Sequence, residues 1–227
     1  MQKLKLSART VQILKNFASI NPSIQFNPGS IIKTMKPGET IIAEAMVIEK
    51  FESSWSILDL SRFLGVMSLF NDPELEIGDT TVTIVDGNRR LNYVFADPAT
   101  LILPIDLIDL PSKDIVFKLT PDDISGINKV LNILALPEIV VRGDGKKMFI
   151  TVADSSKQDS DTYDVGLGKT AKKFSMVFKA ENLKLIQGGY DVIISGQGMA
   201  KFTTADPYNG NKLVYTVIAE HNSKYGE

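Results

Sequence analysis

The stretch with the clearest chemical signature is Gly168-Lys169-Thr170, which has the residue types that end a phosphate-binding P-loop. Such a loop also needs a glycine five positions before Gly168, because its backbone amides must wrap around the phosphates. That position is Tyr163, and the residues after Thr170 alternate in polarity, which predicts a strand where the P-loop lysine should begin a helix. A nucleotide-binding site is therefore not expected here.

Residues for other catalytic or metal-binding chemistry are scarce. The chain has no cysteine and one histidine, His221, which excludes Cys–His catalysis, thiolate metal sites and disulfides and argues against a Ser-His-Asp triad. The best carboxylate pair, Asp122-Asp123, begins a predicted helix, where acids stabilise the helix dipole without any catalytic role. Asp144 lies in a glycine-flanked turn. We therefore expect neither an enzyme nor a metal or cofactor site.

The composition is that of a globular protein with one large domain or two small ones. The 227 residues are 44% hydrophobic and 23% charged, which argues against disorder. No apolar run approaches the ~20 residues that cross a membrane, and the N-terminal residues lack the apolar core of a signal peptide. The net charge is −2, so binding of nucleic acid would require a local basic face.

One succession of elements occurs twice along the chain, which is typical of a duplicated domain. The first copy comprises an amphipathic helix at 6–21, a hairpin at 30–47, a strand at 51–58, a short helix at 59–70 and a meander at 75–98. The second copy comprises a helix at 119–136, a hairpin at 138–154, a strand at 173–178, a short helix at 179–187 and a meander at 190–221. The pattern predicts an α+β fold with two similar domains, 1–97 and 115–227.

Residues 98–114 form a predicted connector between these domains. Pro98, Pro104 and Pro111 prevent a helix and favour an extended path. Its many leucines and isoleucines predict that it lies against an apolar surface, in the manner of a packed segment. Two interpretations stay open: a connector that is simply packed, and one that also borders a pocket for a partner.

Basic residues gather on the predicted helices, whereas acids such as Glu49, Glu76 and Asp154 gather in hairpins and loops and are expected to face solvent. A single charged helix stripe is usually only a solvated face, but the same bias in both copies favours an organised basic surface. Without interleaved aromatic residues, this surface suits phosphate contacts that carry no sequence information. The candidate DNA-facing residues are Lys5, Arg9, Lys15, Arg62, Lys129, Lys179 and Lys184.

With these features the chain resembles the DNA sliding clamps of T-even-type tailed bacteriophages. The resemblance covers nearly the whole length, and its most telling stretches are LKNFASIN at 14–21, SILDLSRFLGVMSLFNDPELEI at 56–77 and ADP at 96–98, together with the repeat. It implies two clamp domains per chain, with helices on one face of antiparallel sheets. It further implies that three chains close head to tail into a ring whose helices line a hole for duplex DNA.

The resemblance also implies the function: a clamp that tethers the replicative DNA polymerase and raises its processivity. A separate ATP-driven clamp loader would open the ring, and related clamps also serve late transcription. The expected location is the cytoplasm of the infected bacterial host, with no membrane contact. The alternative, from a different class, is a duplicated β-rich structural or assembly protein of a virion.

Two further sets of site residues follow from the resemblance. Edge strands near 90–95 and 162–168 would pair between neighbouring subunits, which would explain the Gly168-Lys169-Thr170 stretch as a strand end with edge charge. The expected subunit-interface residues are Arg90, Leu91, Asn92, Tyr93, Phe95, Tyr163, Val165 and Leu167. A pocket for the C-terminal tail of the polymerase is expected to be lined by Leu107, Ile108, Leu110, Ile139, Val217 and Ala219.

Overall fold

The computed structural model describes residues 2–38, 40–157, 159–204 and 212–226. The chain divides into two compact units: unit 1 extends to Asp106 and includes residues 212–213, and unit 2 begins at Leu107. The division therefore lies inside the predicted connector. Residues 205–211, part of the predicted second meander, lie outside the described residues.

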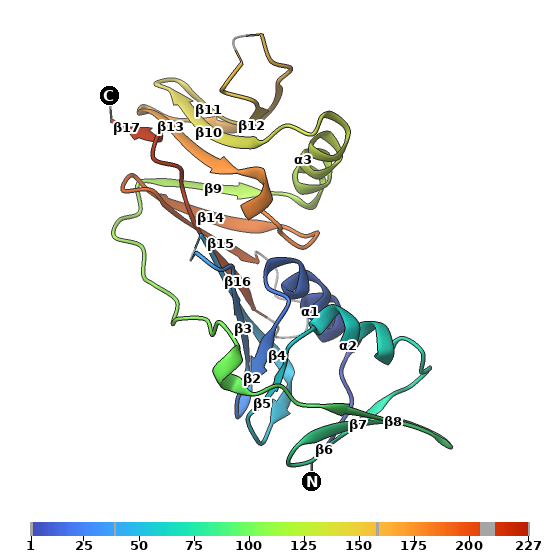
Figure 1. The fold of residues 1–227 in the computed structure, drawn as a ribbon. Helices are drawn as coiled ribbons and strands as arrows, with labels where there is room; N and C mark the ends of the chain where they lie inside the picture. Colours follow the sequence, from blue (N-terminus) through green and yellow to red (C-terminus); the bar gives the residue numbers. More distant parts are fainter. Residues whose placement is uncertain (1, 39, 158, 205–211, 227) are drawn as a thin grey trace. The chain divides into compact units, whose positions relative to one another are not determined.

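The described part of unit 1 contains two α-helices, a four-stranded antiparallel sheet and two further antiparallel strand pairs (Figure 1). Its elements are β1 (Gln2–Leu4), α1 (Ala8–Ile20), β2 (Ile24–Phe26), β3 (Gly29–Met35), β4 (Ile41–Phe51), β5 (Trp55–Ile57), α2 (Leu60–Met67), β6 (Glu74–Ile77), β7 (Thr81–Asp86), β8 (Arg89–Val94) and the 3-10 turn η1 (Pro98–Thr100). One sheet has the order β1-β6-β7-β8, while β3 pairs with β4 and β2 pairs with β5.

Both helices of unit 1 begin at a side chain that caps a free backbone amide. The hydroxyl of Ser7 accepts from the amide of Thr10 at 3.2 Å, and a carboxylate oxygen of Asp59 accepts from the amide of Arg62 at 2.8 Å. Helices α1 and α2 pack against each other, and α1 also packs on β3 and β4. The core beneath them includes Phe26 and Trp55, whose rings stack at 4.1 Å.

Glu49, on β4, is a buried acid, which contradicts the expectation that the acids of the hairpins face solvent. It is only 6% exposed, and its carboxylate accepts from the hydroxyl of Thr10 at 2.6 Å and from the amide of Ser7 at 2.5 Å. Glu76 (6%) and Asp154 (8%) are buried as well. Buried carboxylates persist because hydrogen bonds and opposite charges replace their lost hydration. The partners of Glu49 and Glu76 come from segments far along the chain, whereas those of Asp154 are its neighbours in the sequence.

The described part of unit 2 has one α-helix, a five-stranded antiparallel sheet and a second group of four antiparallel strands (Figure 1). Its elements are β9 (Ile115–Leu119), α3 (Pro121–Leu134), β10 (Glu138–Asp144), β11 (Lys147–Ala153), β12 (Tyr163–Lys169), β13 (Lys173–Lys179), the 3-10 turn η2 (Ala180–Asn182), β14 (Tyr190–Ser195), β15 (Met199–Thr204), β16 (Leu213–Ile218) and β17 (Lys224–Tyr225). The strand orders are β12-β11-β10-β13-β17 and β16-β15-β14-β9.

Helix α3 begins as the sequence predicts and packs on β11 and β12. Thr120 and Asp123 form a reciprocal capping box, and Pro121 occupies the first turn. Ile124 and Ile127 are buried against the sheet. Leu134, whose spacing from Ile124 and Ile127 matches the apolar stripe of an amphipathic helix, is instead 41% exposed at the last turn.

The second short helix predicted at 179–187 is wrong, because only the 3-10 turn η2 forms there. No side chain caps the start of this turn. The backbone carbonyl of Ile186 accepts from the hydroxyl of Tyr190 at 2.6 Å, so a side chain rather than a helical amide satisfies it. The segment buries Leu183 and Ile186 from an irregular backbone. Lys179 and Lys184 therefore do not lie on a helix face.

Candidate functional site

The two segments expected to contact neighbouring subunits are edge strands of their sheets. Strand β8 is the last strand of the sheet in unit 1, and β12 is the first strand of the five-stranded sheet in unit 2. Strand β12 starts at Tyr163 and extends through Lys169, so the glycine and lysine of the P-loop-like stretch belong to a strand. An edge strand presents unpaired amides and carbonyls to any chain that can align with it.

Strand β12 turns an apolar face toward α3. Tyr163, Val165 and Leu167 are half-buried on this face, whereas Asp164 and Gly166 are exposed. The pairing of β11 with β12 changes register at Phe149, which leaves Leu167 without a direct partner, in a bulge. This face of β12 combines a partly covered apolar row with a free backbone edge.

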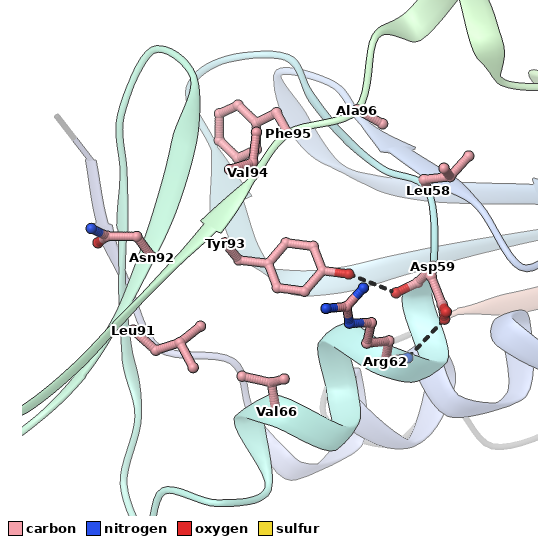
Figure 2. A pocket seen from close by; sticks show the side chains of 10 residues that line it. All are labelled: Leu58, Asp59, Arg62, Val66, Leu91, Asn92, Tyr93, Val94, Phe95 and Ala96. Atoms are coloured by element: carbon pink, nitrogen blue, oxygen red, sulfur yellow. Dashed lines mark hydrogen bonds between the residues drawn. The ribbon is translucent and has the colours of Figure 1, made fainter.

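Strand β8 borders a cavity of ≈ 510 Å³ (Figure 2). The hydroxyl of Tyr93 donates to the backbone carbonyl of Asp59 at 3.2 Å, and its ring meets that of Phe63 edge to face at 5.2 Å. Burial raises the pKa of Tyr93, so the hydroxyl stays a neutral donor. Leu58 (58% exposed) and Val94 (69%) form apolar walls open to solvent. The lining is Leu58, Asp59, Arg62, Val66, Leu91, Asn92, Tyr93, Val94, Phe95 and Ala96.

Arg90, one of the expected interface residues, contacts a carboxylate of its own sheet. Glu76 on β6 contacts Arg90 from β8 and Lys3 from β1, the latter at 2.9 Å. The hydrogen bond from Lys3, together with the charge of Arg90, lowers the pKa of Glu76. These contacts connect β1 to the edge strand, so the polar face of β8 is held in position before any partner binds.

The expected DNA-facing residues of unit 1 have different surroundings. Lys5 forms an ion pair with Asp72, and a guanidinium nitrogen of Arg9 donates to the side chain of Gln12 at 2.7 Å. Lys15 lies in a groove between α1 and α2 that Ser61, Gly65 and Ser68 also line. The exposed side chain of Arg62 instead lines the cavity beside β8.

In unit 2, Lys129 is exposed on α3, in agreement with its predicted place on a helix. Lys179 is the last residue of β13 and lies 3.8 Å from a carboxylate oxygen of Glu220. Lys184 is exposed in the irregular segment after η2. Only Lys129 therefore retains the helical position that the charge pattern assigns to it.

The connector contradicts the expectation that its apolar side chains pack against a surface. Ile102 is 53% exposed, Leu103 42% and Ile108 44%. Ion pairs hold its acids instead: Asp106 lies 2.8 Å from Lys33, and Asp109 lies 3.6 Å from Lys201. Because ion pairs of its aspartates hold the connector in place, its isoleucines need not be buried. These side chains therefore remain accessible to a partner.

The residues expected to line the polymerase-tail pocket are divided between surface and core. Leu107 and Leu110 are half-buried and Ile108 is exposed on the connector, and Ala219 is half-buried. The side chains of Ile139 (2% exposed) and Val217 (0%) lie inside unit 2 and reach no surface.

A different cavity of ≈ 340 Å³ borders the first half of the connector in unit 1. Sequence reasoning missed it, because it depends on the ion pair between Lys33 and Asp106, which links residues far apart in the sequence. The lining is Gln25, Asn27, Pro28, Ile31, Lys33, Leu103, Pro104 and Asp106.

Two features of the described residues bear on other functions. No group of three or more histidines, aspartates or glutamates is arranged to hold a metal ion within that part of the chain. Nor does any helix among the described residues have the length and apolar character needed to cross a membrane.

Comparison with known sequences finds relatives over nearly the full length. No protein-family model matches the chain. Three relatives named sliding clamp do match, and each is covered over 99% of its own length. The relative from Vibrio phage KVP40 is 27% identical over 96% of this chain. The relatives from Enterobacteria phage T4 and Escherichia phage RB69 are 29% and 26% identical, each over 98% of this chain.

Solved structures share the fold at much lower identity. A. fulgidus PCNA, bound to the C-terminal region of FEN-1, has a TM-score of 0.71 at 12% identity and covers 99% of this chain and 100% of its own. The β subunit of DNA polymerase III from Pseudomonas aeruginosa has a TM-score of 0.63 at 10% identity, covering 96% of this chain and 64% of its own. The chain is therefore a relative of the sliding clamps of T4-like phages along nearly its whole length, and it has the fold of clamp-ring subunits.

Proposed function

We propose that the chain is a non-enzymatic subunit of a sliding clamp, a ring that encircles duplex DNA and tethers a DNA polymerase to its template. Support comes from the relatives named sliding clamp, which align with 96% or more of the chain. The alternative of a virion assembly protein is not favoured, because none of these relatives has that name.

The observation that carries the assembly is that β8 and β12 are both edge strands of their sheets and belong to different units. Strand β8 belongs to unit 1 and β12 to unit 2, so a contact between them on different copies is heterologous. Repeated head-to-tail contacts close into a ring when the rotation permits. We infer that three copies close the ring and that Leu91, Tyr93, Val165 and Leu167 meet across each contact.

The DNA contact that we propose is electrostatic and independent of sequence. Lys15, Arg62 and Lys129 are exposed on helices and would approach phosphates in the hole. A ring keeps its DNA by enclosing it, so the low net charge of −2 is compatible with sliding. Reversing the charges of Lys15 and Lys129 together, which lie away from the cavity beside β8, should impair retention on DNA equally for all sequences, without changing the molar mass of the ring.

The part of the connector in unit 2 is the proposed contact for the polymerase tail, because the exposed side chain of Ile108 offers apolar surface there. In a solved structure with the same fold, PCNA of A. fulgidus binds the C-terminal region of FEN-1. A separate ATP-driven loader would open the ring, and the same face would serve late transcription. We place this activity in the cytoplasm of the infected bacterial host.

The absence of cysteine makes site-directed crosslinking a direct test of the ring. Asn92→Cys on β8 and Gly166→Cys on β12 place a thiol on each exposed edge. A short bismaleimide should link the double variant into closed trimers, which are visible by electrophoresis under denaturing conditions. The control combines Gly166→Cys with Lys50→Cys, an exposed residue of β4.

Crosslinked trimers in the control as well, or only dimers with the edge pair, would contradict the head-to-tail contact. Retention on DNA is tested on a nicked circle: rings closed by the crosslinker around the circle should be released when a restriction enzyme linearises it. Release before linearisation would contradict encirclement even if the trimer exists.

A further inference from the structure

Six lysines gather at one end of the five-stranded sheet of unit 2. Two neighbouring turns, between β10 and β11 and between β12 and β13, lie at this end together with β17 (Figure 1). The amide of Thr170 donates to the carbonyl of Lys146 at 3.2 Å, which holds the two turns together. The lysine cluster comprises Lys146, Lys147, Lys169, Lys172, Lys173 and Lys224.

The charges in this cluster are poorly balanced. Lys147 and Lys169 lie directly opposite each other on β11 and β12, an arrangement that destabilises a sheet. Asp144 accepts from the amides of Lys147 at 2.6 Å and Lys146 at 2.7 Å, and these bonds hold its pKa below the ordinary value. Among the described residues, none of Lys146, Lys147, Lys169 and Lys173 forms an ion pair. The packing of the sheet gives no reason for this excess of positive charge.

An apolar cavity of ≈ 430 Å³ lies among these lysines. Phe174 packs so closely on Gly143 that a Cβ there would lie 2.6 Å from the phenyl ring. The aliphatic part of Lys173 lies over Gly145, which keeps its ammonium group near the rim of the cavity. The residues that line the cavity are Gly143, Asp144, Lys173, Phe174, Ser175 and Lys224.

We propose that this end of unit 2 binds an acidic peptide segment that carries one apolar side chain. The carboxylates would contact the ammonium groups of Lys146, Lys147 and Lys169, and the apolar side chain would enter the cavity beside Phe174. A nucleic-acid backbone fits the charge alone, because phosphodiesters have no apolar group for the cavity. The peptide accounts for both features. This surface adjoins the end of edge strand β12, to which Lys169 belongs, and it is separate from the connector.

The test uses the full-length chain and a fluorescein-labelled peptide of alternating aspartate and glutamate with a central phenylalanine. Fluorescence anisotropy should detect binding that weakens with salt. Replacing the phenylalanine with alanine should weaken binding about tenfold. Replacing all acids with asparagine and glutamine should abolish it.

Variants of the protein locate the site. Lys147→Gln with Lys173→Gln should weaken binding about tenfold, because two exposed charge contacts are lost. The matched control is Lys50→Gln with Lys118→Gln, which removes the same charge from exposed positions on β4 and β9 and should leave binding unchanged. Lys146→Gln with Lys169→Gln is a second pair at the site, in case the first alters the fold.

Three outcomes would overturn the proposal. Equal losses in the site and control variants would mean attraction to net charge alone. Equal binding of the phenylalanine and alanine peptides would mean that the cavity holds nothing. Binding of a short duplex DNA that depends on the cluster, without binding of the peptide, would make this a phosphate-binding surface instead.

Discussion

At the scale of single residues, Glu49 shows how a buried charge fixes the position of a helix. Its carboxylate binds Ser7 and Thr10, and so joins β4 to the first turn of α1, where a negative charge also complements the helix dipole. We expect Glu49→Ala to lower the free energy of unfolding by about 3 kcal/mol, because both donors lose their partner. Glu52→Ala, at an exposed site just after β4, should cost less than about 0.5 kcal/mol in the same urea titration. Similar losses for the two variants would contradict the role of Glu49.

A second residue-scale prediction concerns pH. The hydrogen bond from Lys3, with the charge of Arg90, lowers the pKa of Glu76 below 4.5, so the unfolded chain binds more protons in acid. The stabilisation that the Glu76 carboxylate provides is present above pH 4.5 and is lost as the pH falls through the pKa of Glu76 in the folded chain. The pKa of Lys3 is raised above 10.5, so the contribution of Lys3 is lost only in strong alkali.

The measurement compares the unfolding free energy of the wild type and Glu76→Gln across this range. The difference should be largest at neutral pH and should shrink toward zero in acid. A difference that stays constant through the acid range would show that Glu76 acts by packing rather than by charge. Glu52→Gln is the exposed control.

At the scale of elements, the contact between α3 and β12 depends on the absence of a side chain at Gly126. A Cβ there would lie 2.9 Å from the hydroxyl oxygen of Tyr163. Alanine favours a helix by about 1 kcal/mol over glycine, but Gly126→Ala must push the tyrosine away from the helix. Combined with Tyr163→Phe, the same change should instead raise the free energy of unfolding by about 1 kcal/mol over Tyr163→Phe alone. Equal effects of Gly126→Ala in the two backgrounds, measured in urea, would contradict the clash.

The local sequence pattern predicts the helices and turns that neighbouring residues determine. It misses the elements that depend on contacts with residues far along the chain. The start of α3 follows from Thr120 and Pro121 within a single turn, and the hairpins follow from glycine turns such as Gly145, which has a φ of 89°. Strands β1 and β17 were missed, because each is only two or three residues long and pairs with a strand far along the chain. The helix expected at 179–187 fails for the same reason, since Tyr190 and the buried core decide its backbone.

In the candidate site, too, the sequence predicts one part and misses another. Edge strands β8 and β12 could be placed from the sequence because the resemblance supplies their neighbours and each strand has a clear alternation. The cavity beside β8 could not, since it needs Tyr93 to reach the carbonyl of Asp59 on a different element. Charge counting also treats Lys5 as a free cation, although Asp72 neutralises it. The sequence gives the number of charged residues, whereas the ion pairs that they form depend on the fold.

At the scale of the whole molecule, the ring that we propose would close through the backbone edge of β12. Proline at Val165 removes one backbone amide donor from β12 and fixes its φ, and the weaker contact should dissociate the trimer at lower dilution. Light scattering across a dilution series measures this effect. An unchanged trimer mass at sub-micromolar concentration would contradict the role of β12. Circular dichroism must show a native spectrum, because the same proline could also disturb pairing with β11.

Strand β8, on the other side of the proposed subunit contact, contains a residue whose substitution should leave the isolated subunit intact. Val94, at the end of β8, is 69% exposed, so Val94→Asp should cost the single chain almost nothing. In a ring the same side chain would lie at the contact, where an unpaired carboxylate costs several kcal/mol to bury. We therefore expect the dissociation constant of the ring to rise by about a hundredfold or more, which corresponds to about 3 kcal/mol.

Val116 provides the matched control, because it is also a strand valine, 62% exposed, but lies on β9. Val116→Asp should leave the molar mass unchanged at every concentration at which Val94→Asp dissociates. Equal dissociation by both variants would trace the effect to added negative charge on the ring, and dissociation by neither would place the subunit contact away from β8. If only Val94→Asp dissociates, its isolated subunits should keep the wild-type unfolding free energy, since the buried charge exists only when two copies meet.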